Sequence, residues 1–181
     1  MDKEKQTQQV GNLIDSWLDA IDAQPQVAKL NESKITAIDA IIDSFAEIAI
    51  VGLDREPEQW TDGLLEEVMF ARFMLLLEEN EKTEEMYHTI PFALHQLFNY
   101  LQAQGVINNG KELNQWVDDN ATKLQSLYNP KFDKFYRGLY EAMNQSGIDT
   151  SDKKTVDEFT KSYLNLHPEL GIDLYKQDDQ K

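Results

Sequence analysis

The chain of 181 residues contains no cysteine. This absence excludes disulfide bonds, thiolate nucleophiles, zinc–thiolate sites and iron–sulfur clusters. Long hydrophobic runs are also missing. The most apolar stretch, residues 64–77, has glutamates at its margins and is shorter than the roughly 20 residues that a membrane-crossing helix needs. We therefore expect no membrane-spanning helix and no membrane partner.

Basic residues are scarce, with 17 lysines and arginines against 33 acidic residues and a net charge of −16. Because phosphate contacts need clustered cations, this balance opposes binding to DNA, RNA or anionic lipid. A helix-turn-helix over residues 94–119 is excluded, because a recognition helix needs basic or amide side chains and this second helix would present Glu112, Asp118 and Asp119. We expect no nucleic-acid partner. The acidic surface either keeps the protein soluble or engages a basic partner.

Most catalytic motifs are absent too. The sequence has no glycine-rich phosphate loop, no GxSxG elbow, no EF-hand loop and no HExxH. The segment Glu85-Met86-Tyr87-His88 matches the Glu-x-x-His element of helical di-iron proteins, but such sites use two of these elements and the chain has one. We therefore expect no metal and no cofactor. A metal-dependent enzyme that acts through His88 and the neighbouring acidic residues is kept as a third hypothesis.

Residues 64–77 (LLEEVMFARFMLLL) are the most informative stretch that is present. From Val68 to Leu77 every position except Arg72 is apolar. A segment that is apolar nearly all round must be covered on several sides. We therefore predict a central buried helix with other helices packed around it.

The apolar residues elsewhere recur at the spacing of amphipathic helices, and no stretch alternates for long with the period of a strand. The pattern predicts an all-α helical bundle of about seven helices around the central helix 64–77. Capping residues, glycines and prolines place the helices over about 3–23, 31–52, 61–77, 91–105, 113–128, 130–147 and 151–167.

The domain organisation follows from the polar connector 53–59, which contains Pro57. We expect an N-terminal helical hairpin over 1–53, a main helical domain over 60–167 and a partly disordered tail over 168–181. The parts should together form one compact domain. The first twelve residues lack an apolar segment, so we expect no signal peptide and a cytoplasmic location.

Arg72 is the one charge within the most apolar part of the chain. Leaving it buried and unpaired is costly, so it must reach the rim, pair with an acid of a neighbouring helix, or bind an anion or carboxylate in a pocket between helices. The third alternative makes the protein a small-ligand- or anion-binding domain. His95, Tyr136 and Tyr140 are then further candidate ligand-binding residues, because the two tyrosines lie on an aromatic helix face that could frame the pocket.

The leading hypothesis is a non-enzymatic protein that binds a protein partner or itself. It depends on the lack of catalytic motifs and on abundant amphipathic helix. The helix over 3–23 carries the apolar residues Leu13, Ile14 and Trp17 on one stripe. If that helix is loosely attached, these residues are the natural interaction element.

A resemblance supports the bacterial, cytoplasmic reading. Its residues are cap and core positions: Trp60-Thr61, Leu64, Leu65, Glu66, Glu67, Pro91, Phe98, Tyr100-Leu101, Gly105 and Gly147-Ile148-Asp149. In these the chain, from Glu56 to Tyr163, resembles small helical proteins of unknown function from Gram-positive bacteria. The resemblance implies a helical domain and transfers no catalytic residue.

Overall fold

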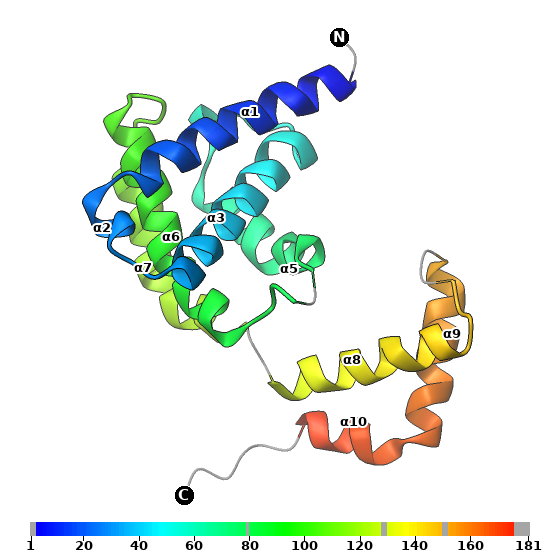
Figure 1. Cartoon of the computed structure of the whole chain (residues 1–181). Helices are drawn as coiled ribbons and strands as arrows, with labels where there is room; N and C mark the ends of the chain where they lie inside the picture. The colour runs from blue at the N-terminus through cyan, green and yellow to red at the C-terminus, as the bar shows by residue number, and fades with distance from the viewer. Residues whose placement is uncertain (1–2, 79, 128–129, 150–151, 176–181) are drawn as a thin grey trace, which may run out of the picture. The chain divides into compact units, whose positions relative to one another are not determined.

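The computed structural model describes the backbone of residues 3–78, 80–127, 130–149 and 152–175, and these residues contain helices and no strand (Figure 1). The fold class is therefore all-α, as the periodicity predicts. The chain divides into two compact units, unit 1 (Met1–Tyr128) and unit 2 (Asn129–Lys181). Each unit has a hydrophobic core of its own.

Unit 1 is a bundle in which α1 packs on α3, α3 on α6, and α6 on α7. Figure 1 shows α6 and α7 side by side, with α1 crossing the bundle. In chain order its helices are α1 (Lys3–Asp22), α2 (Pro25–Ala28), α3 (Glu32–Glu47), η1 (Ile48–Gly52), η2 (Pro57–Gln59), α4 (Asp62–Glu66), η3 (Glu67–Arg72), α5 (Phe73–Leu76), α6 (Glu84–Ala103) and α7 (Gly110–Gln125).

Side-chain caps start three of these helices. The Asn31 side-chain oxygen accepts a hydrogen bond from the Lys34 amide at 2.8 Å, and the Thr61 hydroxyl accepts one from the Leu64 amide at 3.3 Å. The sequence predicts the Thr61 cap, and it predicts either Asn31 or Ser33 for the other helix, of which Asn31 is the cap. The start of α6 is predicted wrongly: Thr83 caps it, so Pro91 lies inside the helix rather than in its first turn.

The predicted central helix is present as three consecutive segments, α4, η3 and α5, and its middle part, η3, is a π-helix. Leu65, Met69 and Phe73 from these segments are fully buried, as expected. Its last turn departs from the prediction, because Leu75 is 82% exposed and Leu76 is 49% exposed. The helix is therefore buried along one face only, since Glu66, Glu67 and Arg72 on its other face are exposed as well.

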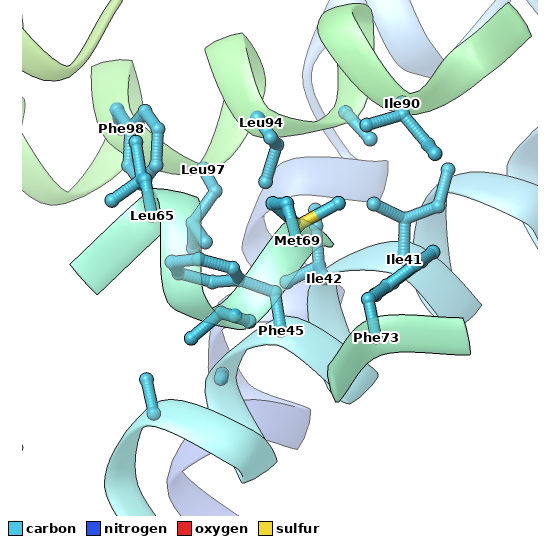
Figure 2. Close-up of a cluster of buried hydrophobic side chains, with 14 of the residues drawn as sticks. Ile41, Ile42, Phe45, Leu65, Met69, Phe73, Ile90, Leu94, Leu97 and Phe98 are labelled. Atoms are coloured by element: carbon cyan, nitrogen blue, oxygen red, sulfur yellow. The ribbon is translucent and has the colours of Figure 1, made fainter. Parts of the chain in front are cut away.

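The core of unit 1 joins the N-terminal hairpin to the rest of the unit. Trp60 is fully buried, and its ring lies edge-on to those of Trp17, Phe45 and Phe98, with centroid distances of 6.5, 5.0 and 6.3 Å. Figure 2 shows the adjoining part of this core, in which Phe45, Met69 and Phe98 come from three separate segments. The contacts divide the chain after Tyr128 and not at the connector 53–59, because Trp60 anchors that connector in the core.

Unit 2 consists of α8 (Pro130–Gln145), α9 (Lys153–Leu166) and α10 (Pro168–Tyr175). The end of α8 matches the prediction: Gly147 has a φ of 69°, and the Ile148 amide donates to the Met143 carbonyl at 3.0 Å. The tail over 168–181 is expected to be partly disordered, and its first part forms α10, where Leu170 packs on the small core of unit 2. The sequence predicts Thr150 or Ser151 as the cap of α9, and this is wrong: Asp152 is the N-cap, and its side-chain oxygen accepts a hydrogen bond from the Lys154 amide at 3.2 Å.

Within the part of the chain that the structure describes, no helix is both long enough and apolar enough to cross a membrane.

Candidate functional site

Arg72 lies at the surface and pairs with a carboxylate of its own helical segment. Its Nε and Nη2 atoms both donate to Oε1 of Glu67, at 3.1 and 2.9 Å, and both side chains are almost half exposed. The wider turn of a π-helix brings residues five apart close together, which explains this pairing. Of the three alternatives for Arg72, the structure therefore has the side chain at the surface, and the acid that balances its charge comes from its own segment rather than from a neighbouring helix.

An apolar groove opens beside Arg72. It has a volume of about 280 Å³ and lies between the turn η1, which follows α3, and the end of the central helix. Its walls consist of Glu47, Ile48, Val51, Gly52, Arg72, Leu75 and Leu76. We call these residues the apolar groove. Leu75, Leu76 and Val51 supply large exposed hydrophobic surface to it.

Two π-helical turns, η1 and η3, lie beside this exposed surface. The core-facing stripe continues past η3, because Met69, Phe73 and Leu77 are all buried. Phe73 still points into the core, whereas the next residues, Met74, Leu75 and Leu76, are exposed. η1 and η3 also contact each other, so both irregular turns border the same groove. Such turns are frequent at functional sites.

Glu47, which lines the groove, is one of several carboxylates that act on Asp43. Asp43 lies one turn before Glu47 on the exposed side of α3. The pKa of Asp43 is raised, first by burial and then by the negative charges of Glu47, Asp15 and Glu81. We call these four residues the acidic rim. Among the described residues, no lysine or arginine forms an ion pair with any of them.

A second group of carboxyls lies between α1 and α3. Oδ1 of Asp22 and Oδ1 of Asp39 are both buried without a hydrogen-bond donor. Burial and the neighbouring charge of Asp22 raise the pKa of Asp39 to about 7, and burial also raises the pKa of Asp22. Two carboxyls in this position share one proton, because both cannot ionise cheaply at short range.

Of the other predicted ligand-binding residues, His95 lies in the same unit as Arg72 but makes its contacts elsewhere. His95 connects α6 to α7: its Nδ1 lies 2.7 Å from Oδ1 of Asn114 and its Nε2 lies 2.7 Å from Oδ1 of Asp118. Both ring nitrogens are therefore engaged, and His95 does not line the groove. Tyr140 is exposed and belongs to unit 2, and the side chain of Tyr136 lies outside the described residues.

The predicted interaction residues on α1 are mostly core residues. Trp17 is 4% exposed and Ile14 is 1% exposed, and both belong to the main core of unit 1. Only Leu13 of the three presents exposed surface. α1 is thus an integral wall of the bundle, and three other exposed apolar residues, Val51, Leu75 and Leu76, lie together on the groove.

In the described part of the chain, the residues of the Glu-x-x-His element do not gather around His88. His88 Nε2 lies 3.6 Å from Oε1 of Glu84, and both side chains are exposed. The Glu85 carboxylate instead accepts a hydrogen bond from the Ser33 hydroxyl at 2.6 Å. Across the described residues, no three metal-ligating side chains converge.

The groove itself was missed by the sequence reasoning, although its signal is present. Residues 74–76 continue the apolar run for longer than the buried face of a helix requires, and the run was interpreted as covered on several sides. Comparison with protein-family models, curated proteins and solved structures finds no match. The function must therefore be inferred from the geometry alone.

Proposed function

We propose that this protein is non-enzymatic and acts by binding another protein through the apolar groove. The observation that carries the proposal is the exposure of Leu75, Leu76 and Val51 on one hollowed surface of unit 1. A groove with apolar walls at helical spacing is a common receptor for one face of a partner helix. In line with the sequence resemblance, we propose a cytoplasmic, bacterial setting.

The size of the groove limits how strong this contact is. Full burial of a leucine contributes about 1.5–3 kcal/mol, so covering Leu75 and the exposed halves of Leu76 and Val51 supplies roughly 3–5 kcal/mol. A binding free energy of about 4 kcal/mol corresponds to a dissociation constant of about 1 mM. Apolar contact alone therefore gives a weak complex, and polar contacts around the groove must add to it.

The test compares the wild-type protein with the double variant Leu75→Ser/Leu76→Ser. Both side chains are solvent-exposed, so the fold should be retained, which thermal melting checks. Leu166→Ser is the matched control, because Leu166 is 77% exposed in unit 2 and lies outside the groove. Light scattering coupled to size exclusion, and capture of partner proteins from a cell extract, measure self-association and partner binding.

We expect the wild-type protein and Leu166→Ser to form the same complexes and Leu75→Ser/Leu76→Ser to lose them. A dimer that only the groove variant dissolves would make a second copy the partner and would still support the proposal. Identical behaviour of all three proteins would contradict it.

A second candidate function is the binding of a small anion or carboxylate in the groove. The position of Arg72 on the groove wall favours this function. The two hydrogen bonds from its guanidinium to Glu67 oppose it, because an anion would have to compete with that carboxylate. Calorimetry with benzoate tests it. Binding that Arg72→Gln abolishes and Glu67→Gln strengthens would favour this function over the first.

A further inference from the structure

Negative charge is distributed unequally over the chain. Residues 1–128 hold 9 of the basic residues and 23 of the acidic ones, so unit 1 has a net charge of −14. Residues 129–181 hold 8 basic and 10 acidic residues. Unit 1, which contains the groove, therefore carries nearly all of the excess negative charge and repels an acidic partner.

The acidic rim concentrates this charge beside the apolar groove. Glu47 belongs to both surfaces: it lines the groove and acts on Asp43 one helical turn away. The negative charges of Asp15 from α1 and of Glu81 from the segment before α6 also act on Asp43. Because no cation within the described residues pairs with these side chains, the rim is an uncompensated negative surface.

A second copy of this chain is a poor occupant for such a site. It would bring the same net charge of −16, and repulsion between like charges opposes close approach. A partner with lysines and arginines is favoured for two reasons. Its cations neutralise the acidic rim, and its apolar residues enter the groove. Opposite charge also supplies the polar contacts that the weak apolar contact needs.

From the position of the acidic rim beside the apolar groove, we infer that the partner segment is a basic amphipathic helix. Its apolar face occupies the groove between Val51 and Leu75, and its lysine or arginine side chains lie against Asp43 and Glu47. This inference rests on the proposed function and adds the chemistry of the partner to it.

The experiment uses two fluorescent peptides of about 15 residues, the length at which isolated helices become stable. One contains leucine at helical spacing with lysine elsewhere, and the other has glutamate in place of every lysine. Fluorescence anisotropy measures the affinity of each peptide for the full chain at low and at high salt. The variants are Leu75→Ser/Leu76→Ser and Asp43→Asn/Glu47→Gln.

Two controls match these variants. Leu166→Ser removes an equally exposed leucine, and Glu58→Gln/Glu112→Gln removes two exposed carboxylates of unit 1 that do not line the groove. We expect the lysine peptide to bind, with affinity reduced about tenfold or more by the groove variant. The rim variant should reduce it about threefold and weaken its salt dependence. Both controls should bind like the wild-type protein.

Equal binding of the lysine and glutamate peptides, with both lost in the groove variant, would overturn this inference and leave the proposed function standing. Lysine-peptide binding that the groove variant leaves unchanged would show general attraction to an acidic chain and would also overturn it. If neither peptide binds, this inference is also overturned.

Discussion

At the scale of the residue, the most consequential feature is the carboxyl pair Asp22 and Asp39 between α1 and α3. Helices normally place such groups in water, and here two Oδ1 atoms are buried without a donor. The cost is reduced when one carboxyl keeps its proton, which is why the pKa of Asp39 is raised to about 7. The charges of Asp22, Asp19 and Asp43 all act in the same direction.

This pair makes unit 1 more stable in mild acid than in mild base. The folded protein holds a proton on Asp39 that the unfolded chain releases, so unfolding is favoured as the pH rises from about 4 to about 7. Since the pair is only partly buried, water screens the repulsion, and we expect a loss of about 1 kcal/mol between pH 5 and pH 8. Asp39→Asn should restore this stability at pH 8 and should change the free energy of unfolding little at pH 5.

Thermal melting of both proteins at pH 5, 6 and 8 measures this difference. Glu58→Gln is the control for removing an exposed carboxylate. If Asp39→Asn destabilises unit 1 equally at every pH, the shared proton is not what holds the pair together.

At the scale of the element, α6 shows how a local signal can be outcompeted. A threonine followed by a proline, Thr89 and Pro91, resembles a helix start, yet α6 begins seven residues before Pro91, at Glu84. Thr83 caps it, and Glu84 and Glu85 lie at its positive end, where they are favourable. Met86, Tyr87 and Ile90 are buried, so packing of this first part outweighs the missing amide of Pro91.

Thr83→Ala should therefore lower the free energy of unfolding of unit 1 by about 1 kcal/mol, because the Met86 amide loses its acceptor. Thr83→Ser keeps the hydroxyl and should behave like the wild-type protein. Chemical denaturation followed by tryptophan fluorescence measures both. Equal stability of the alanine and serine variants would show that the cap contributes nothing.

At the scale of the whole molecule, the division into two units has a spectroscopic consequence. The three tryptophans, Trp17, Trp60 and Trp116, all lie in unit 1. Tryptophan fluorescence therefore reports the unfolding of unit 1, whereas far-ultraviolet circular dichroism reports the helices of both units. Unit 2 depends on a small core of Phe135, Leu139 and Met143, and few buried residues give little stability.

Met143→Ala tests whether the units unfold separately. Met143 is fully buried, so its truncation should cost unit 2 about 2–5 kcal/mol. We expect the circular dichroism of α8 to α10 to be lost at lower temperature while the fluorescence transition stays in place. A fluorescence transition that moves with it would mean that the units unfold as one.

The sequence alone was sufficient for features that neighbouring residues decide. The all-α class, the cap Thr61, and the ending of α8 at Gly147 were predicted because a few adjacent side chains and backbone angles determine them. Arg72 was correctly predicted to need a partner or solvent, since burying a lone charge is costly.

Other features were decided only by the tertiary structure, because they depend on which distant residues meet. The apolar run 64–77 fits a buried helix, and only the packing shows that Phe73 faces the core while Leu75 faces solvent. The connector before Trp60 looks like a boundary until Trp17 and Phe45 enclose that indole. The groove and the acidic rim arise in the same way, because η1, α5 and α3 come together only in the folded chain.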